Sequence, residues 1–188
     1  MRVALCGASS TGKTTLAVDL LASGRLSRPI RHINVDARSL MSELGCKGLD
    51  QMSRDEKCSF QLAYFLRKEH LERDATDFLV ERSFVDVAAF WIERDMAGRP
   101  PSAQSFLLEP CRELAQKYDL HIYMPLGAVP YVQDGWRSSD LAENERIDHS
   151  IKAFLGAWQL PHITMPSGTR EQRVAIALRA ILSIDDDA

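Results

Sequence analysis

The sequence predicts an α/β protein in which helices cover both faces of a five-stranded parallel sheet. Short apolar runs alternate with segments of helical periodicity, and polar residues follow the ends of these runs. Parallel strands read as continuous apolar runs because helices shield both of their faces. The 188 residues suffice for one hydrophobic core. We therefore expect a single domain over residues 1–188, with a lid at approximately residues 126–150.

The expected strands are short and end at glycine or polar residues. The first apolar run stops at Gly7, the second at Asp36 and the third at Glu81. Ligands of open parallel sheets bind at the carboxyl ends of the strands, so these positions predict where a site lies. The strands are expected over residues 2–6, 30–35, 78–80, 120–124 and 162–165.

Capping and stop signals mark the expected helices. Ser53 followed by Glu56 is a capping-box pattern that predicts a long helix to about residue 73. Similar signals predict helices after Asp140 and after Thr169. The other helices are expected from the P-loop segment to Gly24, over 37–44, over 84–97 with a stop at Gly98, and up to Tyr118 with a bend or restart at Pro110.

Composition excludes several classes of protein. Hydrophobic residues make up 45 % and charged residues 26 %, and the net charge is −3. No apolar run reaches the roughly 20 residues that span a bilayer, and no signal peptide is recognisable, so we expect no membrane partner and a cytoplasmic location. The four cysteines are scattered without zinc-ligand spacing, which favours reduced buried thiols.

The segment from Gly7 to Thr14 fits the pattern G-x-x-x-x-G-K-[ST] between a predicted strand and a predicted helix. Its glycines let main-chain N–H groups point at phosphate oxygens, and the helix presents the positive end of its dipole there. We expect Lys13 to reach the β- and γ-phosphates of ATP, and the Thr14 hydroxyl to ligate Mg²⁺. The expected nucleotide contacts are Gly7, Ser9, Ser10, Thr11, Gly12, Lys13, Thr14 and Thr15.

A P-loop alone leaves GTPases, motor ATPases and kinases open. No Asn-Lys-x-Asp segment for guanine is present, and Asp95 to Gly98 matches D-x-x-G only at the end of a predicted helix. No apolar strand ends in Asp-Glu. Instead the third strand ends in Glu81-Arg82-Ser83, where a carboxylate beside the γ-phosphate can take a hydroxyl proton or hold a Mg²⁺-bound water. Arg82 can clamp an acceptor or a phosphate; the alternative is a surface ion pair.

These residues resemble a known group of enzymes. Glu81-Arg82-Ser83 is similar to the Glu-Arg-Ser or Asp-Arg-Ser segment of deoxynucleoside and thymidylate kinases. Residues 77–87 resemble the nucleoside-kinase group that includes nicotinamide-riboside kinase domains, although Glu81 stands where an aspartate is more usual there. Residues 35–38, 119–125 and 134–137 resemble that group's second strand, fourth strand and lid start, and residues 126–130 depart from it. The resemblance implies a P-loop kinase fold.

The resemblance also implies arginines in a lid that closes over the transferred phosphoryl group. We expect Arg137 in this role and place Arg146 with the nucleotide-binding residues. For Arg146 the alternative is a set of surface ion pairs with neighbouring carboxylates.

The acceptor pocket is predicted from polar and aromatic side chains near the strand ends. Asp36 would hold an acceptor hydroxyl or assist as a base, and Arg38 would orient the acceptor; alternatively Asp36 only caps the next helix. Gln61, Tyr64 and Trp91 would read and stack on a base, and core packing is the competing explanation.

The expected activity is transfer of the ATP γ-phosphate to a hydroxyl of a nucleoside, a nucleotide or a modified nucleobase, with Lys13, Glu81, Arg82, Arg137 and Asp36 as catalytic residues. Mg²⁺ would be held by Thr14 and, through water, by Glu81. Phage-type kinases of 5-hydroxymethyluracil in DNA resemble the same group, and a basic surface joining Arg25, Arg28, Arg31 and Arg38 to the cleft would favour that acceptor. A regulatory P-loop ATPase or GTPase is the other alternative, and a homodimer is compatible with either.

Overall fold

The computed structural model of the protein describes residues 1–95, 105–132 and 134–186. Five strands form one parallel sheet in the order β2-β3-β1-β4-β5, which confirms the predicted fold class. In the register, Leu5 of β1 lies between Glu81 of β3 and Ile122 of β4. The strands are β1 (Arg2–Cys6), β2 (Arg31–Asn34), β3 (Phe78–Glu81), β4 (Leu120–Tyr123) and β5 (His162–Thr164).

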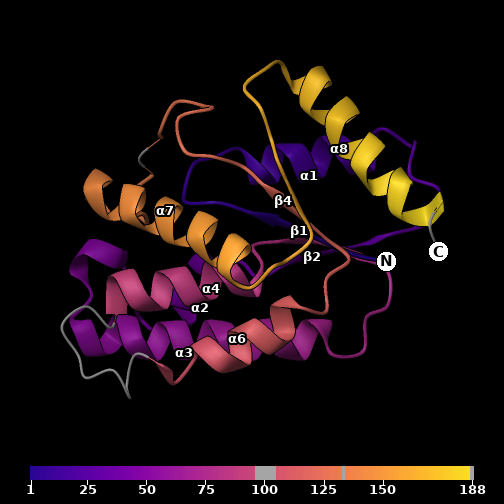
Figure 1. Ribbon diagram of the computed structural model, residues 1–188. Helices are drawn as coiled ribbons and strands as arrows, with labels where there is room; N and C mark the ends of the chain where they lie inside the picture. Colours follow the sequence, from indigo (N-terminus) through magenta and orange to yellow (C-terminus); the bar gives the residue numbers. More distant parts are fainter. Residues whose placement is uncertain (96–104, 133, 187–188) are drawn as a thin grey trace.

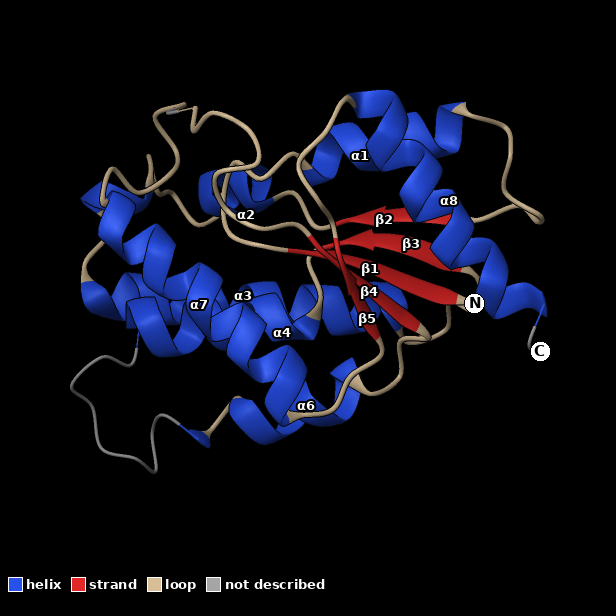
Figure 2. Cartoon of the chain, turned by 45° about the horizontal axis from the view of Figure 1, so that its top comes forward, coloured by secondary structure: helices blue, strands red, loops and turns tan. Residues whose placement is uncertain are grey.

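Helices cover both faces of the sheet (Figures 1 and 2). On one face lie α1 (Lys13–Ala22) and α8 (Arg170–Asp186), which contact each other. On the other face lie α3 (Arg54–Glu72), α4 (Phe84–Phe90), α6 (Leu108–Ala115) and α7 (Leu141–Ala157). The short elements are α2 (Ala37–Glu43), the 3₁₀ turn η1 (Leu49–Gln51) and the π-helical turn η2 (Trp91–Asp95).

Two hydrophobic cores result from the alternation of side chains along each strand. Val3, Leu5 and Ile122 point into the core beneath α1 and α8, whereas Ala4 and Val80 point into the larger core beneath α3, α4 and α7. Every residue of β3 is buried, and this strand ends directly at the functional edge.

Most boundary signals in the sequence are confirmed. The Ser53–Glu56 capping box forms, with Ser53 Oγ accepting the Glu56 N–H and Glu56 accepting the Ser53 N–H. Asp140 likewise accepts the Glu143 N–H at 3.0 Å at the start of α7. Thr169 and Gln172 cap α8 in the same reciprocal way.

One helix expectation is met in one of its two forms, and another needs correction. Pro110 marks a restart rather than a bend, because α6 begins at Leu108 and Pro110 lies in its first turn, where its missing N–H would have no helical partner. The helix expected over 84–97 is α-helical only to Phe90 and continues as a π-helical turn; its expected end at Gly98 lies outside the described residues. Within the part of the chain that the structure describes, no helix is long and apolar enough to cross a bilayer.

Candidate active site at the carboxyl edge of the sheet

The P-loop connects the buried end of β1 to the first turn of α1. Gly7 has φ 148°, and a Cβ at this position would lie 2.4 Å from the main-chain oxygen of Met124, so only glycine fits between the ends of β1 and β4. Gly12 precedes α1 in a left-handed conformation with φ 86°. The first N–H groups of a helix have no partner within it, so the start of α1 presents donors to an anion.

Lys13 is the buried cation of this loop. Its Nζ donates to the main-chain oxygens of Gly7 at 2.7 Å and Ala8 at 2.6 Å, and lies 3.0 Å from the Thr11 hydroxyl. Burial, together with the positive charge of Arg82, lowers the pKa of Lys13 to about 7. The side chain is thus folded back onto its own loop, within reach of anionic phosphates.

Thr14 and Glu81 meet across the floor of the cleft. The Thr14 hydroxyl donates to Glu81 Oε2, and Glu81 is 5 % exposed. The sequence predicted both residues for the metal site, and the structure brings them together. His32, which the sequence reasoning missed, lies with Nε2 3.2 Å from Glu81 Oε1.

Arg82 occupies a strained backbone position with φ 69°, in the left-handed region that non-glycine residues seldom adopt. Its guanidinium carbon lies 4.5 Å from the centre of the Phe90 ring, and Arg94 approaches the same ring at 4.6 Å. Arg82 Nη1 is buried, and it has no hydrogen-bond partner among the described residues. A buried guanidinium with a free donor at a cleft is ready for an anionic or hydroxyl-bearing ligand.

Asp86 ties the strand end to the P-loop. One carboxylate oxygen accepts the Gly7 N–H at 2.9 Å. The other accepts the Ser83 N–H at 2.8 Å and lies 3.1 Å from the Ser83 hydroxyl, completing a capping box at the start of α4. Asp86 is fully buried, so the two segments that carry Lys13 and Glu81 share one rigid anchor.

A cleft of about 840 Å³ extends from the P-loop across the strand ends to α2 and α3. The side of the cleft formed by α3 carries Phe60, Gln61 and Tyr64. Gln61 Nε2 donates to the Val87 oxygen at 3.1 Å, which fixes the orientation of its amide. The Tyr64 hydroxyl is buried, and it has no hydrogen-bond partner in the described parts of the chain.

Asp36 lines the same cleft and also caps α2. Its carboxylate accepts the Arg38 N–H at 3.0 Å and the Ser39 hydroxyl at 2.6 Å. The bond from Ser39 is the main cause that lowers the pKa of Asp36. A lowered pKa makes a weak base, so the geometry suits an acceptor of hydrogen bonds rather than the general base allowed by the sequence.

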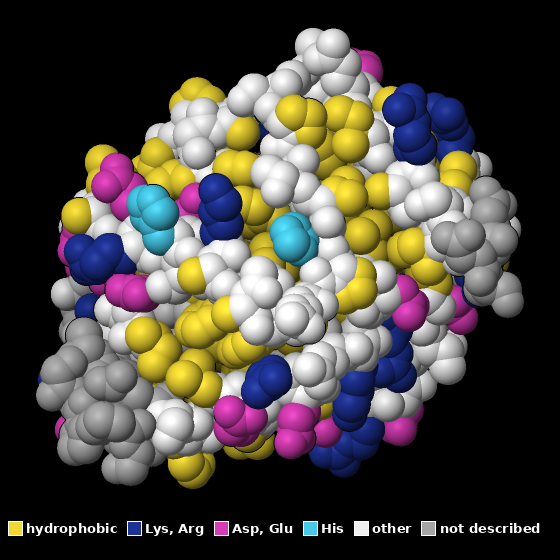
Figure 3. Space-filling model, viewed as in Figure 1, with side chains coloured by type: hydrophobic (Ala, Val, Ile, Leu, Met, Phe, Trp, Pro, Cys, Tyr) yellow, Lys and Arg dark blue, Asp and Glu magenta, His cyan; other side chains and the backbone are white. Residues whose placement is uncertain are grey.

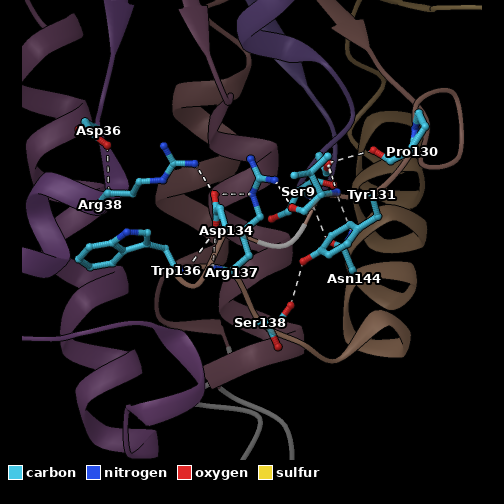
Figure 4. A network of polar contacts seen from close by, with 12 residues as sticks. Ser9, Asp36, Arg38, Pro130, Tyr131, Asp134, Trp136, Arg137, Ser138 and Asn144 are labelled. Atoms are coloured by element: carbon cyan, nitrogen blue, oxygen red, sulfur yellow. Dashed lines mark hydrogen bonds and ion pairs between the residues drawn. The ribbon is translucent and has the colours of Figure 1, made fainter.

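The loop between β4 and α7 lines another side of the cleft, and Figure 4 shows its polar network. Asp134 of this loop forms ion pairs with Arg38 of α2 and, at 3.3 Å, with Arg137. The loop also approaches the P-loop, because the Ser10 hydroxyl accepts the Val132 N–H at 3.0 Å. Arg137 therefore lies in the cleft, as predicted, and pairs with a carboxylate there.

The loop between β4 and α7 also contacts the start of η1 through main-chain atoms. The Leu49 N–H donates to the Trp136 oxygen at 3.1 Å. Gly48 has φ 151°, and a Cβ there would lie 2.6 Å from the main-chain oxygen of Gly135. Close approach of the two backbones at this point depends on glycine.

Asn144 of α7 clamps the P-loop. Its Oδ1 accepts the Ser9 N–H at 3.1 Å, and its Nδ2 donates to the Ser9 oxygen at 3.3 Å (Figure 4). Further along α7, Asp148 accepts the Leu126 N–H at 3.2 Å and the Tyr123 hydroxyl at 2.8 Å. Residues 141–150 of the expected lid segment are therefore part of a packed helix anchored to the P-loop and to the end of β4.

The structure does not bring two predicted residues to the cleft. Trp91 is 2 % exposed and packs in the core, with its ring 6.5 Å from that of Phe106. Arg146 is not among the residues that line the cleft, and it forms ion pairs with Glu93 at 3.6 Å and Asp140 at 3.8 Å. For both residues the competing explanation holds, because a buried indole packs and an exposed guanidinium among carboxylates forms surface ion pairs.

The cleft also holds residues that the sequence reasoning missed. Arg173 of α8 donates to the Gly168 oxygen at 3.0 Å and to the Ala128 oxygen at 3.3 Å, above Gly12. Arg94 also lines the cleft, whereas His32 is not among the lining residues and is connected to the site through Glu81. For His32, the alternation of side-chain direction along the second strand was a signal that could have found it. No local sequence pattern marks Arg94 or Arg173.

The donor set fits a Mg²⁺ ion that is held jointly with nucleotide phosphates. In the described ranges, no group of three or more His, Cys, Asp or Glu side chains could hold a metal alone. Thr14 supplies a hydroxyl and Glu81 a carboxylate, and Mg²⁺ usually takes one or two protein oxygens plus phosphates and water.

The fold and the P-loop define the class: a P-loop α/β protein with the fold of nucleoside and nucleotide kinases. A deoxyadenosine kinase from M. mycoides with products dCMP and dCDP superposes with a TM-score of 0.72 at 12 % identity, covering 98 % of this chain and 100 % of that one. A thymidylate kinase from Candida albicans gives 0.65 at 15 % identity, covering 99 % and 92 %.

The NadR protein in complex with NR gives a TM-score of 0.66 at 14 % identity, covering 97 % of this chain and half of that one. A family model described as an AAA domain matches residues 2–173, and the chain belongs to that family. No curated protein matches the sequence.

Proposed function

We propose that this chain is an ATP- and Mg²⁺-dependent phosphotransferase that moves the γ-phosphate to a hydroxyl of a nucleoside, a nucleotide or a modified nucleobase. One observation carries the proposal: the Thr14 hydroxyl touches the Glu81 carboxylate at the point where the P-loop opens into the acceptor side of the cleft. A metal-ligand group and a candidate base thus share one position between the two substrates.

On the nucleotide side, the amides at the start of α1 and Lys13 would bind the phosphates of ATP. Lys13 gains anionic partners in place of its own loop oxygens, which stabilises its charged form. Thr14, and through water Glu81, would hold a Mg²⁺ ion, which would supply positive charge to offset that of the phosphates. Arg173 and the loop at Gly168 border the same region above Gly12.

On the acceptor side, Glu81 would accept the proton of the attacking hydroxyl, with His32 holding its other oxygen. Arg82 would bind the acceptor through its free buried donor. Arg137 would leave Asp134 for the transferred phosphoryl group when the part of the expected lid (approximately residues 126–150) that precedes α7 closes. We assign all of these steps to a single catalytic domain, residues 1–188.

The acceptor wall favours a ligand with a flat ring and a few polar groups. Phe60 and Tyr64 offer aromatic surface, Gln61 offers a fixed amide, and Asp36 and Arg38 offer polar contacts at the rim. Among the structural neighbours, the deoxyadenosine kinase holds dCMP and dCDP and the NadR protein holds NR, which is consistent with a nucleoside-like acceptor.

The structure lends the DNA acceptor no specific support. Arg31 begins β2, and Arg28 lies 3.4 Å from Asp77, which precedes β3, so both are at the opposite end of the sheet from the cleft. On the face in Figure 3, Lys and Arg side chains form separate groups, several of them beside acidic ones. Hydroxymethylated DNA is therefore included among the acceptors that are tested, and it is not proposed as the substrate.

The test is a transfer screen with ATP labelled in the γ-phosphate. Acceptors would be nucleosides, nucleoside monophosphates and hydroxymethylated DNA, with Mg²⁺ present and absent. We expect label on one acceptor class, dependent on Mg²⁺ and lost in Glu81→Gln. Release of label only as inorganic phosphate would contradict the proposal and favour a regulatory ATPase.

A further inference from the structure

The peptide unit between Arg82 and Ser83 is held at both ends by buried charged side chains. Lys68 Nζ donates to its carbonyl oxygen at 2.6 Å, and Asp86 Oδ2 accepts its N–H at 2.8 Å. Lys68 and Asp86 are both 0 % exposed. Polar groups buried this deeply must be satisfied, so the two contacts fix the orientation of this peptide plane.

A buried network in turn holds Lys68 behind the cleft. Its Nζ pairs with Glu72 one helical turn away, and the other oxygen of Glu72 accepts the Tyr118 hydroxyl at 2.7 Å. The ammonium also lies 4.9 Å from the centre of the Phe84 ring. Burial lowers the pKa of Lys68, and the charge of Glu72 opposes that effect.

A buried ion pair is a poor way to stabilise a fold, because apolar residues of similar volume often do so as well or better. The network therefore invites a different explanation, and the position of Arg82 offers one. With φ 69°, Arg82 needs its surroundings to hold it in a conformation that a free chain avoids. In that conformation its N–H still pairs with Leu5 of β1 at 2.8 Å, while its guanidinium lies over Phe90 in the cleft.

We propose that Lys68, with Glu72 and Tyr118 behind it, is a positioning residue that holds the Arg82–Ser83 peptide in place and thereby aims the Arg82 guanidinium into the acceptor cleft. Asp86 couples the same peptide to the P-loop through the Gly7 N–H. The proposal rests on the proposed function for its kinetic consequences, but the geometry it predicts can be observed without any activity. Lys68 itself need not touch a substrate.

The test uses the double variant Lys68→Met with Glu72→Met, which removes the ion pair together and leaves no lone buried charge. A matched control is Glu69→Gln with Arg73→Gln, a partly exposed i,i+4 pair at the C-terminal end of the same helix. Both variants should unfold cooperatively. Because small misplacements of a catalytic group cost up to about 100-fold in rate, we expect kcat of the Lys68/Glu72 variant to fall about 10- to 100-fold. The KM for ATP should not change, and the control should match the wild type.

Coupling to Arg82 separates positioning from general damage. If Lys68 acts through Arg82, adding Arg82→Ala to the double variant should cause no further loss of kcat beyond that of Arg82→Ala alone. If the losses of kcat caused by Arg82→Ala and by the Lys68/Glu72 changes multiply in the combined variant, the proposal is overturned. A wild-type kcat in the Lys68/Glu72 variant would overturn it as well.

A crystal structure of the Lys68/Glu72 variant decides the matter if no acceptor is found for the wild type. We expect Arg82 to leave φ 69° for a negative value and its guanidinium to leave the Phe90 ring. An unchanged Arg82 would overturn the inference, whereas a moved Arg82 in a protein without transfer activity would uphold the positioning and contradict only the proposed function.

Discussion

At the residue scale, Lys13 connects protonation to nucleotide binding. The pKa of Lys13 is about 7, because burial and Arg82 disfavour the charged form. Bound phosphates would favour the charged form, so ATP should raise this pKa again. Below pH 7 the lysine is already protonated, whereas above pH 7 it must take up a proton as ATP binds.

The lowered pKa of Lys13 therefore predicts that the protein takes up a proton when ATP binds at alkaline pH. At pH 8 about one proton should be taken up per ATP, and at pH 6 the contribution from Lys13 should vanish. Calorimetric titration in buffers of different ionisation enthalpy measures the uptake. The variant Lys13→Arg, which stays charged, is the control, and equal uptake in that variant would contradict the assignment.

Glu81 carries the strongest residue-level prediction for transfer. Glu81→Gln keeps the size and one oxygen that can accept the Thr14 hydroxyl but removes the base. ATP binding should persist while kcat falls about 100- to 10,000-fold, the usual worth of a general base. Near-normal kcat would remove Glu81 from the catalytic role.

At the element scale, α7 is tied to the P-loop by Asn144. The variant Asn144→Leu would leave the Ser9 N–H and carbonyl without their partner in a buried position. Buried unsatisfied groups cost about 1–3 kcal/mol, so the free energy of unfolding in urea should fall by roughly that amount. ATP affinity should fall as well, because the loop loses its support.

The matched control for this prediction is Lys152→Gln, an exposed change on the same helix. It should leave both the free energy of unfolding and the ATP affinity unchanged. Wild-type ATP affinity in Asn144→Leu would show that the clamp does not shape the P-loop.

At the scale of the whole molecule, the binding of nucleotide should stabilise the fold. A ligand at 100 times its Kd adds about 2.7 kcal/mol to the free energy of unfolding, so ATP with Mg²⁺ should raise the Tm. Lys13→Ala should fold and lose this increase, because it removes the cation of the loop. A Tm increase of wild-type size in Lys13→Ala would contradict the role of Lys13.

The fold and the P-loop were predictable because their signals are local. The P-loop occupies eight consecutive residues, and the capping boxes at Ser53 and Thr169 each span one helical turn. Apolar runs in β1 and β3 needed no partner to be recognised as strands. These features depend on backbone geometry and burial, which neighbouring residues largely determine.

The rest of the site depends on contacts between distant segments. Asp86 reaches Gly7 across 79 positions and Asn144 reaches Ser9 across 135, and no periodicity marks either pair. Trp91 was assigned to the acceptor because aromatic side chains serve both cores and ligands, and only its burial distinguishes the two.

The central claim is that the cleft couples ATP turnover to an acceptor. The most direct measurement compares ADP and inorganic phosphate formed by the wild type with and without the acceptor class found in the screen. We expect ADP to form only with the acceptor, in step with phosphorylated product and without free phosphate. If ADP and phosphate formed in equal amounts without any acceptor, at the rate seen with the acceptor, the cleft would not couple ATP turnover to phosphoryl transfer.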